Sequence, residues 1–184
     1  RKKPPESLDT YEAFLRFYYL VNVLTPEAFE ETIRILEQAV TREPECGLAW
    51  SMLAHLYCMN YTLQFSPLKT PLEKALVFAK KGGSLDSQNQ QVRAAMAYLH
   101  FRYDERDLFL LEAEKAMALN PNSPFFIGYL GWLLALYGEW DRGLAILGKG
   151  IELNPHYPGW FRMAPYLDFF RQGKYKEAFQ EAQQ

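Results

Sequence analysis

His55 and Cys58 are the residues best placed for metal or thiol chemistry, because they lie three positions apart and would share one face of a helix. A metal site needs at least a third protein ligand, and nothing in the sequence brings Cys46 or His156 to this pair. No run of cations near Cys58 would activate a catalytic thiolate. We therefore predict no metal centre and no catalytic cysteine, and we interpret His55 and Cys58 as a half-buried pair in a groove.

The segment from Gly143 to Gly150 has the spacing of a phosphate-binding loop, with Gly148-Lys149 at the expected place. Gly150 stands where that motif needs a Ser or Thr to hold magnesium, and no strand pattern precedes the segment. We therefore expect a helix in which the glycines serve packing.

Two carboxylate pairs raise the question of acid–base catalysis. Glu30-Glu31 has Arg34 one helical turn away, which is typical of a solvated outer face, and Asp104-Glu105 falls in a turn between two expected helices. No nucleophile, base and orienting residue can be assembled from the sequence. The prediction is that the chain is not an enzyme and uses no cofactor.

Composition narrows the class further. The 184 residues are 49% hydrophobic and 23% charged with a net charge of −2, which is typical of a globular protein. The one basic run, Arg1-Lys2-Lys3, lies in an expected linker over residues 1–7, and no stretch is apolar enough to span a bilayer, so we predict neither nucleic-acid nor membrane binding. Two cysteines without a CxxC pair favour a reducing, cytoplasmic location.

An internal repeat predicts the helices that position these side chains. Pro121 and Pro155 lie 34 residues apart, each after a Leu-Asn pair, and Ser87 lies 34 residues before Pro121. Pro44 precedes Ser87 by 43 residues, which is one period plus nine. The nine extra residues predict one insertion.

Two columns of residues recur at this period, one small and one apolar. A helix hairpin explains both, because a small side chain lets two helices approach and the apolar residue one turn earlier fills the seam. The small column is Ala39, Gly82, Ala116 and Gly150, and the apolar column is Leu36, Ala79, Ala113 and Leu147.

The motif Trp50-x2-Leu53-Ala54-x2-Tyr57, together with Leu130-Gly131-x2-Leu134, resembles the tetratricopeptide repeat family, and the period extends this resemblance over residues 8–184. It implies an all-α fold, an α–α superhelix of about five helix pairs. The expected repeats are 13–46, 47–89 with the insertion, 90–123, 124–157 and a truncated 158–184. The first and third repeats depart from the pattern, with Arg16, Tyr19, Leu20, Thr32, Arg93 and His100 at signature positions.

Helix starts are marked by Thr25-Pro26 and Thr70-Pro71, each an N-cap followed by proline, and Thr70 with Glu73 forms a capping-box pattern. The insertion then falls within residues 58–70, where it either lengthens the preceding helix or forms a loop. Phe65 and Leu68 are apolar, so we expect this segment to pack back onto the repeats.

The family geometry implies that the first helix of each pair lines a concave groove. That groove would be aromatic and apolar, suited to a bound peptide or helix. The alternative is that these rings pack between adjacent helices. The Lys and Asn residues with which some family members clamp acidic chaperone tails are missing. The predicted partner-binding residues are Phe17, Val21, His55, Tyr98, Phe101, Arg102, Trp132, Arg162, Tyr166 and Phe169.

The C-terminal third, including Gly138-Glu139-Trp140 and Pro158-Gly159-Trp160, resembles repeat regions that follow adenylate cyclase-like or winged-helix domains in bacterial signalling proteins. This resemblance implies a regulatory or scaffolding module that binds a protein or peptide and belongs to a longer chain. The alternative is self-association, because Tyr175, Ala178 and Phe179 would form an apolar stripe on a truncated last helix.

Overall fold

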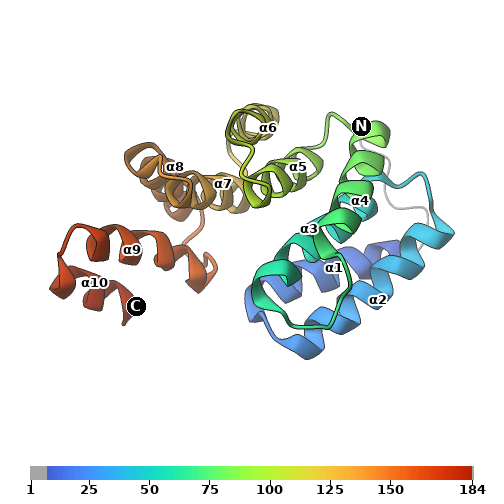
Figure 1. Cartoon of the computed structure of the whole chain (residues 1–184), viewed down its shortest axis with the longest axis horizontal. Helices are drawn as coiled ribbons and strands as arrows, with labels where there is room; N and C mark the ends of the chain where they lie inside the picture. Colours follow the sequence, from blue (N-terminus) through green and yellow to red (C-terminus); the bar gives the residue numbers. More distant parts are fainter. Residues whose placement is uncertain (1–7, 184) are drawn as a thin grey trace. The chain divides into compact units, whose positions relative to one another are not determined.

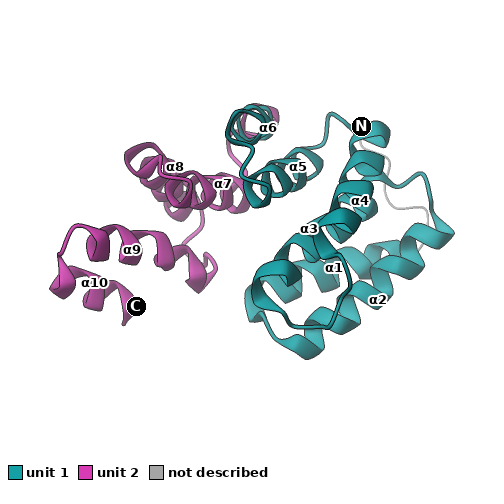
Figure 2. Cartoon of the chain, in the orientation of Figure 1, with its two compact units in different colours: residues 1–116 teal, residues 117–184 magenta. Residues whose placement is uncertain are grey.

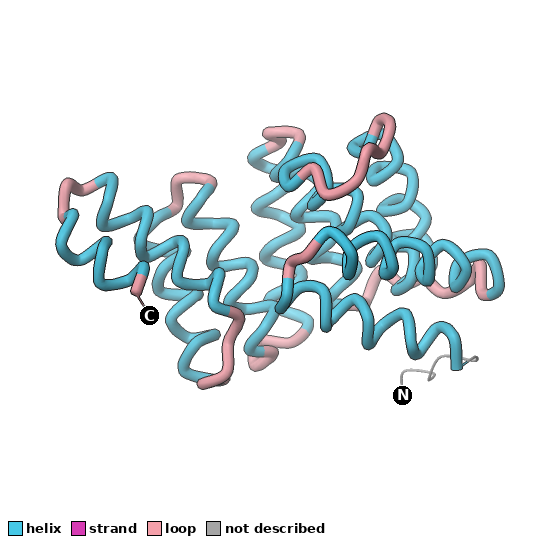
Figure 3. Tube along the Cα trace, turned by 90° about the horizontal axis from the view of Figure 1, so that it is seen from below, coloured by secondary structure: helices cyan, strands magenta, loops and turns pink. Residues whose placement is uncertain are grey.

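Residues 8–183 are described by a computed structural model, and every regular element in this range is a helix (Figures 1 and 3). Consecutive helices form five pairs, which confirms the all-α prediction. The expected linker at residues 1–7 lies outside the described range. The elements are α1 (Leu8–Val23), α2 (Pro26–Arg42), α3 (Gly47–Leu63), α4 (Pro71–Leu85), α5 (Gln90–Arg102), α6 (Arg106–Leu119), α7 (Pro124–Leu136), α8 (Trp140–Leu153), a 3-10 helix η1 (Gly159–Arg162), α9 (Met163–Arg171) and α10 (Tyr175–Ala182).

The helices belong to two compact units, one ending at Ala116 and one beginning at Met117 (Figure 2). In the first unit α3 packs against α1, α2, α4 and α5, so it is the central helix, and Leu53 and Leu56 are fully buried. In the second unit α7 packs against α8, η1 and α9. Its core includes Leu147 of α8 and Phe161 of η1, both 1% exposed. Each unit therefore buries a core of its own.

The two helix starts marked by Thr-Pro are confirmed, but only one uses its threonine as a cap. The Ala28 amide donates to Oγ1 of Thr25 at 3.3 Å, so α2 begins with a side-chain cap. Thr70 makes no such bond, since its backbone is left-handed at a φ of 47°. The predicted capping box of Thr70 and Glu73 is therefore wrong, because a side-chain cap normally requires an extended backbone at the N-cap residue.

The insertion combines the two alternatives left open by the sequence. Its first part lengthens α3 to Leu63, and its second part is a loop over residues 64–70. The Asn60 amide fastens this loop by accepting from the Ser66 N–H at 3.0 Å and donating to the Ser66 carbonyl at 2.9 Å. Phe65 contacts Phe29 of α2, with ring centroids 5.6 Å apart, so the expected packing onto the repeats is confirmed.

The small-residue column lies where two helices touch. A Cβ at Gly82 of α4 would stand 2.2 Å from the Ser51 hydroxyl and 2.8 Å from the Gly47 carbonyl of α3. At Gly150 of α8 it would stand 2.6 Å from Cα of Gly128 in α7. The prediction of close helix approach is confirmed at both positions, and the associated apolar column is buried throughout.

The positions that depart from the repeat pattern are satisfied by polar contacts. Arg93, in place of a tryptophan, donates to Glu112 of α6 at 2.9 Å and to the Ser87 carbonyl at 2.8 Å. Nδ1 of His100, in place of a tyrosine, lies 2.5 Å from a Glu105 carboxylate oxygen. The α5–α6 pair is thus held partly by charge where other repeats use aromatic packing.

No helix within residues 8–183 is both long enough and apolar enough to cross a membrane.

Candidate functional site

A continuous row of rings crosses the first unit, and we call Phe17, His55, Tyr98 and Phe101 the ring row. Phe17 of α1 meets His55 of α3 edge-on at 5.3 Å between centroids, and His55 meets Tyr98 of α5 at 5.0 Å. Tyr98 stacks on Phe101 at 6.4 Å. The sequence-predicted column is therefore brought together across α1, α3 and α5.

Most of the ring row is buried. Phe17 is 1% exposed, His55 8% and Tyr98 7%, and the neighbouring Val21 is 4% exposed. Rings that are enclosed to this degree pack the helices against one another and offer little area to a partner. Phe101, at the C-terminal end of α5, is half-buried and keeps one part of the row accessible.

His55 and Cys58 lie on one face of α3, as their spacing predicts, but both are buried, so the expected half-buried pair is wrong. The central helix α3 is covered by four neighbours, which the spacing of two residues cannot reveal. Burial lowers the pKa of His55 to about 4 and raises the pKa of the Cys58 thiol to about 12. At neutral pH both side chains are uncharged, which suits packing and not thiolate or acid–base chemistry.

Arg102 follows directly on the ring row. Its guanidinium carbon lies 4.6 Å from the Phe101 ring centroid and 5.6 Å from that of Tyr98, and its Nη1 donates to the Thr62 hydroxyl of α3. The Arg102 side chain is half-buried. A cation over two rings, with aromatic area still accessible, can take part in recognition.

The second unit contains a cluster of rings that we call the aromatic platform: Phe125, Tyr129, Trp132 and Trp160. Trp132 of α7 meets Trp160 of η1 edge-on at 5.3 Å between centroids and stacks on Tyr129 at 6.3 Å. Phe125 lies 6.3 Å from Trp160. Phe125, Trp132 and Trp160 are only half-buried, so the platform combines fixed geometry with accessible aromatic area.

Of the remaining predicted residues of the second unit, Arg162 and Tyr166 line a hollow together with Trp160 of the platform. Arg162 is held by Glu181 of α10 at 3.0 Å and donates to the Tyr157 hydroxyl at 2.6 Å. Tyr166 stacks on Phe170, and Phe169 lies under the Lys174 ammonium, 6.0 Å from its ring centroid. A hollow next to the platform is lined by Gly159, Trp160, Arg162, Met163, Tyr166, Glu181 and Ala182.

The other chemistry-bearing candidates remain on helix surfaces or in turns. The segment 143–150 lies inside α8, with Gly143 and Gly150 packed on α7, so no phosphate-binding loop forms. Asp104 and Glu105 occupy the α5–α6 turn, and Glu31 pairs with Arg16 at 3.2 Å. Among the side chains of residues 10–183, no three His, Cys, Asp or Glu residues converge on a metal position.

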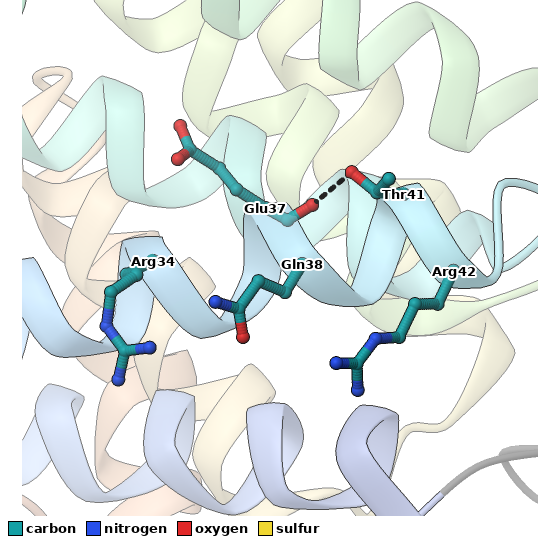
Figure 4. Close-up of a pocket in the computed structure, with 5 residues that line it drawn as sticks. All are labelled: Arg34, Glu37, Gln38, Thr41 and Arg42. Carbon is teal, nitrogen blue, oxygen red and sulfur yellow. Dashed lines mark hydrogen bonds between the residues drawn. The ribbon is translucent and has the colours of Figure 1, made fainter.

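A second hollow lies on the outside of α2 (Figure 4). It is lined by Arg34, Glu37, Gln38, Thr41 and Arg42, all from one helix, and Thr41 donates to the Glu37 carbonyl at 2.8 Å. A ligand pocket needs walls on several sides, and side chains from a single helix do not provide them. This hollow is therefore interpreted as a solvated helix face.

Sequence reasoning missed several residues of these clusters. Trp160 was outside the predicted set because it belongs to η1, whereas the repeat pattern pointed to the regular first helices. Tyr129 lies one turn before Trp132, and that spacing was an available signal. Tyr18 of α1 donates to Gln91 of α5 at 2.8 Å, a contact between residues that only the tertiary structure brings together.

Successive helix pairs with small residues at their crossings are typical of helical-repeat proteins, and solved structures that resemble this chain have the same fold. Two crystal structures of MamA match with TM-scores of 0.53 and 0.52, at 21% and 20% identity. The first match covers 84% of this chain and 85% of that chain, and the second covers 95% and 88%. The likeness shows the fold, an α–α superhelix of the tetratricopeptide type. No family model matches the chain.

Curated relatives give a further, partial similarity. The transcriptional regulators HilA of Salmonella typhimurium and of Salmonella typhi are each 24% identical over 149 residues, which is 81% of this chain. The chain spans 27% of the length of these relatives.

Proposed function

We propose that this chain is a non-catalytic interaction module that binds a peptide or helix of another protein, with the aromatic platform as its main contact. The observation that carries the proposal is the pairing of Trp132 and Trp160, two half-buried indoles held edge to face at 5.3 Å. Tryptophan in a fixed, partly accessible position is the side chain most enriched among residues that dominate binding energy.

Polar chemistry at the platform supports the same conclusion. The indole Nε1 of Trp132 is buried and has no hydrogen-bond acceptor among the described residues. A buried donor without a partner costs roughly 1–3 kcal/mol, and a ligand carbonyl at this point would remove that cost. Ring faces for apolar side chains next to a donor for a carbonyl are the combination that a peptide requires.

The first unit contributes its own accessible positions. Phe101 and Arg102 are half-buried and Tyr18 is 39% exposed, whereas Phe17, Val21, His55 and Tyr98 are buried. Tyr166, Phe169 and Arg162 of the second unit extend the accessible area around the platform. The predicted partner-binding set thus divides into a supporting and a contacting group.

The similarity to the HilA transcriptional regulators supports a regulatory setting. We place the module in a larger bacterial signalling protein, in the cytoplasm, where the two free cysteines would stay reduced. Its role there is to recruit or restrain a protein partner and not to carry out a reaction.

The test is a selection of random dodecapeptides displayed on phage, followed by titration of the enriched synthetic peptides. We expect the Trp132→Ala, Trp160→Ala double variant to bind them at least about tenfold more weakly than the wild type. Trp132→Phe, which keeps a ring but loses the N–H, should show a smaller loss. Equal affinity of wild type and double variant would refute the platform as the binding site.

A matched control removes apolar area elsewhere. Leu108 and Leu111 of α6 are 45% and 46% exposed, so the Leu108→Ala, Leu111→Ala variant loses accessible apolar surface outside the proposed site. Its peptide affinity should equal that of the wild type. Circular dichroism of each variant separates a binding defect from loss of helix.

Self-association is a second candidate function, favoured by one observation on the last helix pair. Phe170, Tyr175 and Phe179 are 53%, 65% and 62% exposed. The expected stripe is therefore exposed at Tyr175 and Phe179, but it does not include Ala178, which is only 2% exposed. Phe170, whose ring contacts that of Tyr175, takes its place. Such an apolar face suits a second copy of the chain.

The preceding repeat supports this assignment. Gly138 and Gly173 both follow a first helix with positive φ, so they set the register between the last two repeats. In that register Tyr175 and Phe179 correspond to Trp140 and Leu144, which pack against the core that contains Phe161 of the following repeat. The exposed rings are thus in positions that a neighbouring helix pair covers one repeat earlier.

A further inference from the structure

Arg102 differs from the other half-buried arginines among the described residues in its charge pairing. Four arginines are half-buried, and three have a carboxylate partner: Arg16 with Glu31 at 3.2 Å, Arg93 with Glu112 at 2.9 Å, and Arg162 with Glu181 at 3.0 Å. Arg102 has no carboxylate partner among the side chains of residues 10–183. Removing a guanidinium from water is costly unless a counter-charge is present. The other half-buried arginines have such a counter-charge, and Arg102 does not.

The guanidinium is held by contacts on one side, and on the other side Nε has no hydrogen-bond partner among the described residues. Nη1 donates to the Thr62 hydroxyl, and the guanidinium carbon rests 4.6 Å from the Phe101 ring centroid. The Nε atom is buried and has no acceptor for its N–H among the described residues. The Nε–Nη2 edge is the side of arginine that takes both oxygens of a carboxylate.

The insertion explains why this arginine is fixed. Thr62 belongs to the part of α3 that the nine extra residues lengthen, and the loop behind it is fastened by Asn60 to Ser66. Tyr61 and Leu63, on either side of Thr62, are 51% and 42% exposed, so apolar area surrounds the contact. The added segment thus supplies both the hydroxyl that holds Arg102 and the apolar neighbours.

From this geometry we infer that Arg102 is an anion-binding subsite which receives the carboxylate of an Asp or Glu side chain of the bound protein, next to an apolar or aromatic residue of that partner. The inference rests on the proposed interaction function and names the chemistry of the ligand. Among the half-buried arginines, Arg162 is already neutralised by Glu181, which leaves Arg102 as the acceptor of an external charge.

The direct test is a titration of the uniformly ¹⁵N-labelled chain with two small probes, acetyl-Phe-Glu-amide and acetyl-Phe-Gln-amide. The Arg102 Nε–H resonance, assigned by its loss in Arg102→Lys, reports contact at the site. We expect a saturable shift with the glutamate probe, in about the millimolar range, and at least about tenfold weaker binding of the glutamine probe. Equal shifts with both probes, or no shift with either, would overturn the subsite.

Two variants keep the result specific. Arg102→Gln should abolish the preference for the glutamate probe, whereas Arg34→Gln, which removes an exposed charge on the outside of α2, should leave it unchanged. Loss of the preference in Arg34→Gln would show that the net charge of the chain, and not the Arg102 site, attracts the probe. Thermal unfolding of both variants checks that the fold is intact.

The display selection separates this subsite from the interaction function itself. Enriched peptides that contain Asp or Glu at a fixed position and bind Arg102→Gln at least about tenfold more weakly support the subsite. Enriched peptides without a fixed acidic residue, with equal affinity for Arg102→Gln and wild type, overturn the subsite and leave the platform proposal standing. If no peptide is enriched, the platform proposal fails, and the probe titration alone decides on Arg102.

Discussion

At the scale of single residues, His55 is a titratable side chain that burial keeps uncharged, so that it serves packing. Its ring lies between Phe17 and Tyr98, is 8% exposed, and has a pKa lowered to about 4 by desolvation. The folded chain therefore holds His55 neutral down to a pH at which the same residue in the unfolded chain is protonated. Proton uptake by the unfolded state then favours unfolding.

This predicts a loss of stability in mild acid that depends on one residue. The contribution of His55 is intact above its unfolded pKa of about 6.5 and decreases as the pH falls toward about 4, by about 2 kcal/mol between pH 7.5 and 5. Urea unfolding at both pH values measures it. In His55→Phe, which cannot titrate, the fall in unfolding free energy should be smaller by about that amount. The same fall in both proteins would contradict the assignment, whatever their absolute stabilities.

At the scale of helix pairs, the crossing of α3 and α4 depends on the absence of a side chain. A Cβ at Gly82 would stand 2.2 Å from the Ser51 hydroxyl and 2.8 Å from a backbone oxygen, whereas a Cβ at the adjacent Gly83 meets nothing within 4 Å. Two neighbouring glycines of one helix thus have opposite structural roles.

Alanine at these two positions should have effects of opposite sign. Gly82→Ala forces the helices apart and is expected to reduce the unfolding free energy by about 1–3 kcal/mol. Gly83→Ala removes backbone freedom from the unfolded chain at no steric cost and should add about 0.5–1 kcal/mol. Chemical denaturation of both variants checks the pair. An unfolding free energy of Gly82→Ala equal to that of the wild type would mean that α3 and α4 do not approach as closely as described.

The two threonines before α2 and α4 give a second test at this scale. Thr25 accepts the Ala28 amide and Thr70 makes no side-chain cap bond. Thr25→Ala should therefore cost about 1 kcal/mol, and Thr70→Ala less than about 0.5 kcal/mol. Thermal melts compare the two. A larger loss at Thr70 would show that it caps α4 as its sequence pattern predicted.

At the scale of the whole molecule, the question is whether copies of the chain associate. The rings at Phe170, Tyr175 and Phe179 present apolar area that a solvated helix end does not need. Because equivalent positions are covered one repeat earlier, contact with a second copy would bury them in a similar way.

Sedimentation equilibrium over about a hundredfold range of concentration tests this association. The wild-type mass should rise with concentration, and Tyr175→Ser with Phe179→Ser should raise the dissociation constant at least about tenfold. Leu108→Ser with Leu111→Ser, which alters exposed leucines of α6, is the control and should behave as the wild type. A constant mass for the wild type would leave peptide recognition as the proposed function without self-association.

The sequence by itself determined the fold class and the places where helices approach. The 34-residue period, the small column that includes Gly82 and Gly150, and the prolines at the starts of α2 and α4 are local signals, each with a direct steric cause. They predicted helix pairs without knowledge of what lies beside them. The insertion was also located, since it interrupts the period at one place.

Only the tertiary structure decided which of the predicted site residues are accessible and which are buried. His55, Tyr98 and Trp132 occupy the same position of the repeat, yet His55 and Tyr98 are buried while Trp132 is half-buried. Exposure depends on residues distant in sequence, such as Phe17 beside His55 or Trp160 beside Trp132. The same holds for Arg102, which has no carboxylate partner among the described side chains. Whether a charge is compensated depends on which groups lie near it in the folded chain, and the spacing of residues in the sequence does not show this.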